Sequence, residues 1–206
     1  MLTDTVHLPL PPAEPEHPWP SQGQWTYADF LRLPDDGRRY EIIEGVLYMA
    51  NAPSYEHQYT VAKLVQRLGD FVEARGLGIV IAAPFEVHLP GIATPVQPDV
   101  LYITAARQPH IGAQTFEGAP DLVVEVLSPG SLRLDQFVKF GAYERAGVRE
   151  YWLADPKARD VIVYSLPANG REYVELGQFG PGEKLKSSVL AGLEVAVDDL
   201  FAPPAA

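Results

Sequence analysis

The clearest pattern along the chain is a helical stripe between Ser54 and Gly76. Its apolar side chains recur at intervals of three and four residues, at Val61, Leu64, Val65, Leu68, Phe71 and Val72. This spacing places them on one face of an α-helix. Ser54 suits the N-cap of that helix and Gly76 the C′ position just after it. The pattern therefore predicts a long helix with one apolar face.

Short apolar runs typical of β-strands occupy much of the remaining chain. A hairpin or a bulged strand is expected over Tyr40 to Met49, around Gly45. Further strands are expected at residues 78–83, 85–89, 99–104, 121–127, 150–154, 161–166 and 173–179. Two more helices are predicted, one at residues 27–33 and one at about 135–146. This order predicts an α/β or α+β fold, with helices beside a sheet whose central strands are buried on both faces.

The length of the chain, 206 residues, corresponds to about one domain. Six prolines between Leu8 and Pro20 remove many backbone donors, so this segment is expected to be an extended arm. We therefore divide the chain into a proline-rich arm at residues 1–24, one domain at 25–201 and a short tail at 202–206.

The composition narrows the classes of protein that the sequence permits. Apolar residues make up 47% of the chain, which is enough for a core and excludes a wholly disordered protein. The absence of cysteine excludes disulfides, thiolate metal sites and a cysteine nucleophile. No basic start followed by an apolar stretch is present, and no apolar run approaches the length of a membrane span. We therefore expect a soluble, cytoplasmic protein.

The net charge of −11 argues against a protein that coats nucleic acid along its length, because like charges repel at long range. The charge is uneven along the chain. The segment from Ser128 to Arg159 contains six basic and four acidic side chains. A small basic zone is expected there.

Two carboxylates stand in or beside runs that are expected to be buried strands. Glu125 lies inside the apolar run Leu122 to Leu127, and Asp99 opens the next such run upstream. Burying a carboxylate in an inner strand costs free energy unless a partner compensates its charge. If the two strands are neighbours, both carboxylates converge and require a cation between them. Oxygen ligands favour magnesium or manganese, and such a site suits phosphodiester hydrolysis.

Each candidate residue also has an ordinary structural explanation. Asp99 suits a turn after proline, and Glu125 suits an ion pair with a buried arginine or lysine. Lys139 suits the solvated face of its helix, and His57 suits a capping or surface role in the first turn of its helix.

Other polar and aromatic residues have equally ordinary explanations when each is taken alone. Glu41 and Glu44 fit the polar face of a strand. Tyr143, Tyr151 and Trp152 fit a core or a dimer interface, where aromatic rings bury a large area and keep a polar edge.

A set of motifs nevertheless occurs in a fixed order between about Tyr27 and Leu166. The motifs are Tyr40-Glu41-Ile42-Ile43-Glu44-Gly45, His57, Pro98-Asp99-Val100, Asp121 to Pro129, Asp135, Lys139, Tyr143, Gly147-Val148 and Glu150-Tyr151-Trp152-Leu153. Together they resemble the Uma-two family of restriction-endonuclease-like proteins in the PD-(D/E)XK nuclease superfamily. The resemblance implies a mixed four-stranded central sheet flanked by helices, with a metal site where two adjacent strands diverge. It also implies that Asp99 and Glu125 are the two acids of the motif.

One position departs from the superfamily pattern. A lysine is expected two residues after Glu125, but that position holds Leu127. In the Uma-two pattern a lysine from the following helix replaces it, which here is Lys139. Because a lysine stem is long and this helix packs on the strand, Lys139 is expected to reach the site. There it would orient the water or stabilise the charge that develops on the phosphoryl oxygens.

Three further residues are candidates for the site. Glu44 is a candidate for an additional ligand, directly or through water. His57 is a candidate for contacting the phosphate or transferring a proton. Asp135 suits the N-cap of the second long helix better than a ligand position.

The leading hypothesis is a metal-dependent endonuclease that hydrolyses DNA, with a homodimer implied by the resemblance. The alternative is a catalytically weak or inactive nuclease fold that binds nucleic acid or protein. The absence of the strand lysine and the acidic net charge favour that alternative. A third hypothesis is metal-free hydrolysis by paired carboxylates, as in glycosidases.

Overall fold

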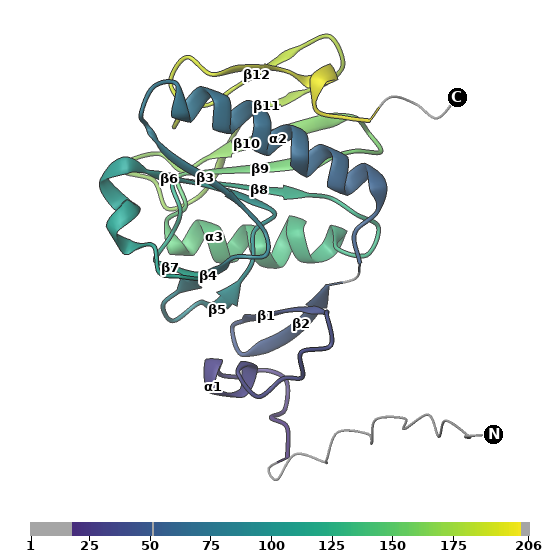
Figure 1. Ribbon diagram of the computed structural model, residues 1–206, viewed down its shortest axis with the longest axis vertical. Helices are drawn as coiled ribbons and strands as arrows, with labels where there is room; N and C mark the ends of the chain where they lie inside the picture. The colour runs from purple at the N-terminus through teal and green to yellow at the C-terminus, as the bar shows by residue number, and fades with distance from the viewer. Residues whose placement is uncertain (1–17, 51, 203–206) are drawn as a thin grey trace, which may run out of the picture.

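The computed structural model describes residues 18–50 and 52–202. Most of the predicted arm and tail, residues 1–17 and 203–206, lie outside the described residues. The described chain forms sheets of six, five and two strands. Helices lie against both faces of the six-stranded sheet (Figure 1).

The larger sheet has the strand order β11-β10-β9-β8-β6-β3. Its strands are β3 (Gly78–Ala82), β6 (Val100–Thr104), β8 (Leu122–Val126), β9 (Glu150–Asp155), β10 (Asp160–Ser165) and β11 (Val174–Phe179). β8 and β9 run parallel, and the other neighbouring strands run antiparallel. The sheet is therefore mixed, as the resemblance implies, but it has six strands rather than four.

Both faces of this sheet are covered, which explains the continuous apolar runs of its central strands. Every residue of β8 is buried. Val124 packs in a cluster with α2 (Tyr55–Glu73) and with the C-terminal segment. That segment consists of β12 (Lys184–Lys186), β13 (Glu194–Ala196) and η3 (Val197–Asp199). Val123 points the other way, into a cluster with α3 (Phe140–Ala146) and the smaller sheet.

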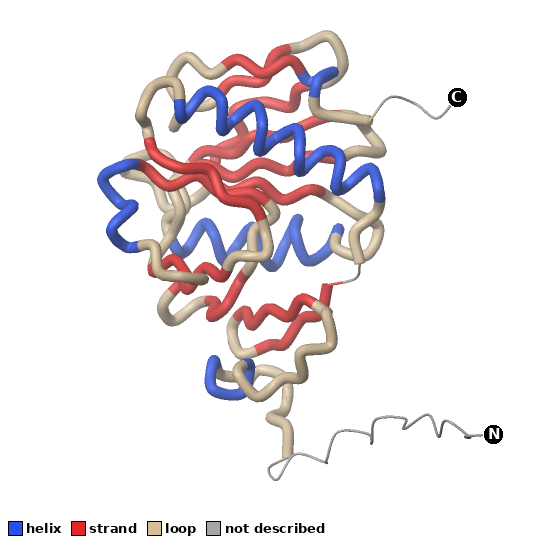
Figure 2. Tube along the Cα trace, in the orientation of Figure 1, coloured by secondary structure: helices blue, strands red, loops and turns tan. Residues whose placement is uncertain are grey.

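The smaller sheet has the order β2-β1-β5-β4-β7 and lies on the α3 side of the molecule (Figure 2). Its strands are β1 (Arg39–Ile43), β2 (Val46–Ala50), β4 (Glu86–Leu89), β5 (Ala93–Val96) and β7 (Thr115–Glu117). The sequence pattern predicted the β1–β2 hairpin and β4 but missed β5 and β7. β5 contains Pro95, and β7 has three residues, so neither gives a recognisable alternating run.

Two of the three predicted helices, α1 and α2, begin where capping side chains predicted them. In α1 (Tyr27–Phe30), Thr26 and Asp29 form a reciprocal capping box. At α2, the Ser54 hydroxyl accepts a hydrogen bond from the backbone N–H of His57 at 3.3 Å. A short 3₁₀ helix, η1 (Ala105–His110), follows β6.

The predicted helix after β8 consists of two different parts. Its first turn and a half is the π-helix η2 (Leu134–Lys139), and α3 continues from it. The backbone N–H of Phe140 donates to the carbonyl of Asp135, the five-residue spacing of a π-helix. Gly147 ends α3 in the left-handed conformation, with φ of 85°.

These elements confirm the predicted fold class, a mixed sheet flanked by helices with additional C-terminal strands. No helix within residues 18–50 and 52–202 combines the length and the hydropathy that crossing a bilayer requires. The seam between the larger sheet, α3 and the smaller sheet is where the candidate polar residues gather.

Candidate metal and nuclease site

Asp99 and Glu125 face each other across two neighbouring antiparallel strands. Val100 on β6 pairs with Val124 on β8, so the next opposed positions in this register are Asp99 and Glu125. Opposed residues of antiparallel strands project to the same face. Because Val100 and Val124 face α2, the two carboxylates are on the α3 side. Both are buried, with 3% of Asp99 and 1% of Glu125 exposed.

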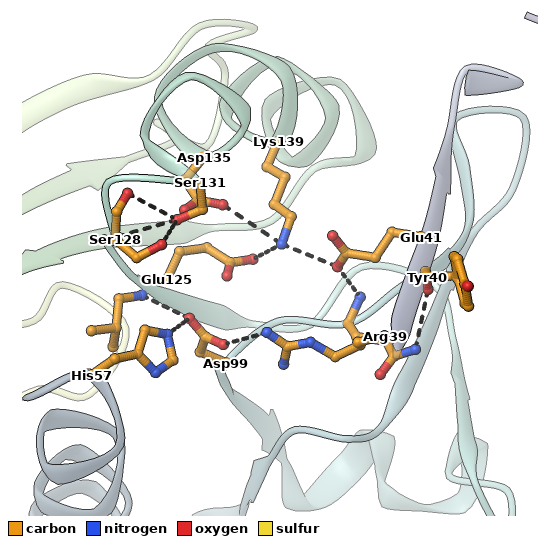
Figure 3. A network of polar contacts seen from close by, with 12 residues as sticks. Arg39, Tyr40, Glu41, His57, Asp99, Glu125, Ser128, Ser131, Asp135 and Lys139 are labelled. Atoms are coloured by element: carbon orange, nitrogen blue, oxygen red, sulfur yellow. Dashed lines mark hydrogen bonds and ion pairs between the residues drawn. The ribbon is translucent and has the colours of Figure 1, made fainter. Parts of the chain in front are cut away.

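Lys139 approaches these carboxylates from η2 (Figure 3). Its Nζ lies 3.1 Å from Glu125 Oε1, 3.0 Å from Glu41 Oε1 and 3.6 Å from Asp135 Oδ1. Both Lys139 and Asp135 are buried, so η2 directs its charged side chains inward. The lysine that the strand lacks at Leu127 is thus supplied by the helix, as the resemblance implies.

The β1 strand contributes Arg39 and Glu41. Alternate residues of a strand share a face, so Arg39 and Glu41 point the same way as buried Ile43. The backbone N–H of Gln97 donates to Glu41 Oε1 at 2.7 Å. Arg39 Nη2 lies 3.2 Å from Asp99 Oδ1.

Glu44 does not join this cluster, which corrects its assignment as a candidate ligand. It occupies the β1–β2 turn with φ of 51°, and its carboxylate accepts a 2.5 Å hydrogen bond from Arg145 on the surface. The reason is the turn itself: Glu44 and Gly45 are the two residues between the paired strands. Glu41, three residues earlier, is the acid that reaches the site.

His57 contacts Asp99 from the first turn of α2. Its Nε2 lies 3.0 Å from Asp99 Oδ2, and its Nδ1 is buried without a partner in the described part of the chain. The same Asp99 oxygen accepts a hydrogen bond from the backbone N–H of Val126 at 2.9 Å. His57 and Val126 therefore fix the orientation of the Asp99 carboxylate.

Asp99 is an ionised carboxylate in this setting. Burial raises its pKa, but the hydrogen bond to His57 and the charges of His57, Arg39 and Lys139 outweigh burial. Together they lower the pKa of Asp99 from 3.8 to about 2. Asp99 thus presents a negative charge at neutral pH.

The pKa of Glu125 shifts in the opposite direction to that of Asp99. Burial raises its pKa well above the usual value, Lys139 opposes this shift, and Asp99, Asp135 and Glu41 add to it. Burial lowers the pKa of Lys139, but the surrounding carboxylates outweigh burial and raise it, so its ammonium remains charged. Burial and the neighbouring acids thus disfavour the ionised form of Glu125, and an added cation would favour it, as Lys139 does.

The two oxygens of Glu125 differ in their contacts. Oε1 accepts hydrogen bonds from Lys139 Nζ at 3.1 Å and from the Tyr143 hydroxyl at 2.8 Å. Oε2 accepts none from the described residues. Glu125 lines the small cavity of the site, where a carboxylate oxygen that accepts no hydrogen bond is a position at which a cation would be favourable.

Two cavities meet at this cluster. A small one of about 60 Å³ is lined by the acids Glu41, Asp99, Glu125 and Asp135, together with Lys139. A larger one of about 780 Å³ extends from it between the β1–β2 hairpin, the start of α2 and the residues around Pro84. Arg39, His57 and Asp99 line both cavities. Of the four acids, Asp99 lines the larger cavity, which is large enough for part of a polymeric substrate, and the other three line the smaller cavity beside it.

The donor set fits a hard divalent cation, although the side chains are not gathered around one. Within the described ranges, no three acidic or histidine side chains are drawn together as a metal-binding group. The acids offer oxygen donors, which magnesium and manganese prefer. Their four carboxylates face two permanent cations, Lys139 and Arg39. This excess of carboxyl groups over permanent cations, together with a Glu125 Oε2 that accepts no hydrogen bond from the described residues, fits an added cation.

The structure thus brings together Asp99, Glu125, Lys139 and His57 and separates Glu44 from them. Asp135 is inside the cluster rather than at the N-cap, because η2 begins one residue before it. Sequence reasoning missed Arg39 and the contributions of Glu41 and Tyr143. The available signal was the alternation of Arg39, Glu41 and Ile43, which puts both polar residues on the apolar side of β1.

Three of the six basic side chains in the expected zone between Ser128 and Arg159 are engaged with acids. Lys139 is buried in the site, Arg145 pairs with Glu44, and Arg149 lies 3.7 Å from Asp121. These three cations are paired with carboxylates of the same chain. Arg39 contacts the site from outside that segment.

Known proteins that resemble this chain in sequence or in fold are described as putative nucleases. The sequence model of the Uma2 (Uma-two) family, described as "Putative restriction endonuclease", matches residues 27–198. The fold is similar to a crystal structure described as a putative nuclease belonging to DUF820 from Anabaena variabilis. The match to that structure has a TM-score of 0.71 and a sequence identity of 24%, and it covers 85% of this chain and 97% of the other. No curated protein matches. Because the family match spans most of its length, the chain belongs to the Uma2 family, described as putative restriction endonucleases.

Proposed function

We propose that the protein is a metal-dependent nuclease that hydrolyses phosphodiester bonds of DNA. The observation that carries the proposal is the convergence of Asp99 and Glu125 across β6 and β8, with Lys139 Nζ 3.1 Å from Glu125. Membership of a family described as restriction endonucleases supports nuclease chemistry.

Asp99 and Glu125 would hold the cation, and Glu41 is a further candidate ligand. Magnesium or manganese, when bound, supplies Lewis-acid stabilisation of the phosphoryl oxygens and a water of lowered pKa. Lys139 holds the carboxylates of Glu125 and Glu41 in place and adds a fixed positive charge near the reacting phosphate. His57 orients Asp99, and its unpartnered Nδ1 is available for proton transfer.

The substrate would enter through the larger cavity. Arg38 and Arg39 line its wall beside Asp99, and arginine is well suited to phosphate contacts. A homodimer, the assembly that the resemblance implies, would bring one site to each strand of a duplex. Sedimentation velocity of the full chain measures that assembly.

Cleavage of supercoiled plasmid and of single-stranded DNA, with magnesium or manganese, tests the proposal. Asp99→Asn, Glu125→Gln and Lys139→Met should each lower the cleavage rate by about 100-fold or more, since each removes a charge at the reacting centre. Asp70→Asn, on the exposed side of α2, is the matched control and should cleave at the wild-type rate. Excess chelator should abolish cleavage.

Two results would overturn the proposal. One is a wild-type rate in both Asp99→Asn and Glu125→Gln. The other is cleavage that survives the chelator, which would instead favour metal-free acid/base hydrolysis by the paired carboxylates. Thermal unfolding of each variant distinguishes lost chemistry from lost folding.

A nuclease fold without hydrolysis is the second candidate. It is favoured because Lys139 and Arg39 already pair with the acids and because the described residues contain no gathered metal-binding group. Calorimetric titration with manganese chloride separates the two candidates. The nuclease should bind manganese and lose that binding in Glu125→Gln, whereas a non-hydrolytic scaffold should show no binding in either protein.

A further inference from the structure

Arg39 occupies one side of the Asp99 carboxylate, at the boundary between the two cavities. Its Nη2 lies 3.2 Å from Asp99 Oδ1, while the other oxygen of Asp99 is held by His57 and by the Val126 N–H. Asp99 Oδ1 therefore has a cationic side chain, rather than a backbone donor, as its partner. Among the contacts of Asp99 with the described residues, the contact with Arg39 involves a partly exposed side chain.

Arg39 is held less firmly than Lys139. Within the described residues, its guanidinium makes a hydrogen bond to Asp99, through one nitrogen, and 28% of its side chain is exposed. Lys139 is 4% exposed in its side chain and lies near three carboxylates. Moving Arg39 away from Asp99 therefore breaks one hydrogen bond, whereas moving Lys139 would break its contacts with Glu125 and Glu41.

The surroundings of Arg39 allow it to move without disturbing the core. Its backbone is fixed by pairing of β1 with β2, where Arg39 is opposite Ala50. Its side chain lines both the small acidic cavity and the larger cavity of about 780 Å³. Rotation of the side chain alone transfers the guanidinium from Asp99 to the larger cavity.

The charges favour such an exchange. Glu41, Asp99, Glu125 and Asp135 are four acids beside two permanent cations, and a divalent ion compensates them better than the single charge of Arg39. The displaced guanidinium would then face the cavity that is proposed to take the substrate. A planar guanidinium binds two oxygens of a phosphate at once.

We propose that Arg39 is a built-in competitor of the divalent cation for Asp99, and that it becomes a phosphate-binding residue when the cation displaces it. This inference rests on the proposed function and adds a regulatory step to the same site. It makes DNA binding depend on metal binding. When no cation is bound, Asp99 keeps its contact with Arg39. When the cation is bound, Arg39 is free to contact the substrate.

Calorimetric titration of the full chain with manganese chloride tests the competition without measuring activity. Arg39→Met should bind manganese about five-fold more tightly than the wild type, because Asp99 no longer has to release a cation. Arg39→Lys, which keeps the charge, should resemble the wild type. Arg38→Met is the matched control, because the neighbouring arginine pairs with Asp36 instead of with Asp99, and its manganese affinity should equal that of the wild type.

Fluorescence anisotropy with a labelled DNA duplex tests the second half of the proposal. Calcium replaces manganese here, so that the duplex can be titrated under non-cleaving conditions. Adding calcium should strengthen DNA binding by the wild type and by Arg67→Met, a charge-matched control whose ion pair with Asp199 lies outside both cavities, and should strengthen it much less for Arg39→Met. Thermal unfolding confirms that the variants are folded.

The outcomes separate this inference from the proposed function. Manganese binding by the wild type that is lost in Glu125→Gln but is unchanged or weaker in Arg39→Met overturns the competition alone. Equal calcium-dependent gains in DNA affinity for Arg39→Met and Arg67→Met overturn the phosphate role of Arg39. Absence of manganese binding by the wild type overturns both the inference and the metal-dependent function.

Discussion

Tyr143 shows how one hydroxyl influences the candidate site from within the core. Its ring projects from α3 and is fully buried, and its hydroxyl donates to Glu125 Oε1 at 2.8 Å. Burial, with the charge of Glu125 next in importance, raises the pKa of Tyr143 well above its usual value, so the hydroxyl remains a donor. An apparently ordinary core aromatic therefore positions a carboxylate of the site.

We predict that Tyr143→Phe lowers the free energy of unfolding by about 1–2 kcal/mol, because it leaves a buried carboxylate oxygen with one donor fewer. Urea unfolding measures the change. Tyr40→Phe is the control, since its hydroxyl bonds Asp36 in an exposed contact, and it should change stability by less than about 0.5 kcal/mol. Equal effects in the two variants would contradict the structural role given to Tyr143.

The β1–β2 hairpin is the element that determines which acid enters the site. Glu44 and Gly45 both have positive φ, of 51° and 70°, as the tight turn between twisted strands requires. This turn leaves Glu44 at the tip and directs Arg39 and Glu41 inward. A Cβ added at Gly45 would lie 2.5 Å from the carbonyl oxygen of Gly23.

We predict that Gly45→Ala destabilises the protein by about 1–3 kcal/mol, from the positive φ together with the backbone contact. Gly91→Ala is the matched control: its φ is 74°, but an added Cβ meets nothing within 4 Å. Gly91→Ala should lower the free energy of unfolding by about 1 kcal/mol, because it introduces the unfavourable backbone conformation without a steric contact. Chemical unfolding of both variants gives the difference, and equal losses would exclude a steric role for Gly23.

The residues of the site differ in how well the sequence predicted them. Asp99 and Glu125 were found because a carboxylate inside or beside a continuous apolar run is itself anomalous. Lys139 was found through the family resemblance, since helix spacing alone gives it a solvated position. Alternation with Ile43 puts Arg39 and Glu41 on the apolar side of β1, but the docking of that hairpin against η2 is a long-range contact that a single sequence does not specify.

The fold was predicted best where periodicity was strong and worst where strands were short. The capped helix α2 and the inner strands β6 and β8 follow from local pattern. β5 and β7 depend on pairing partners distant in the chain and contain few residues, so tertiary contacts rather than propensity determine them. The π-helical turn of η2 likewise has no periodicity of its own in the sequence.

At the scale of the whole molecule, the net charge of −11 repels DNA while the cluster of acids faces the cavity. Three of the six cations of the expected basic zone are paired within the chain, as with Arg145 and Glu44. The arginines that line the larger cavity are Arg38 and Arg39. Contacts with phosphate are therefore expected to be few and local.

We predict a shallow salt dependence of DNA binding. With two phosphate contacts, the logarithm of the binding constant should fall with the logarithm of salt concentration with a slope of about −2. Fluorescence anisotropy at several sodium chloride concentrations, with calcium present, gives the slope. A slope of about −5 or steeper would reveal a phosphate-binding surface elsewhere on the protein.

The acidic cluster spans a joint between two separately hydrogen-bonded sheets. Arg39 and Glu41 belong to the smaller sheet, whereas Glu125 belongs to the larger one. Polar side-chain contacts across this joint hold the groups in register, including those of Lys139 with Glu41 and of Arg39 with Asp99. A slight slip of the two layers would separate the groups while each sheet stayed intact. Mild heating is therefore expected to inactivate the protein before its circular dichroism changes.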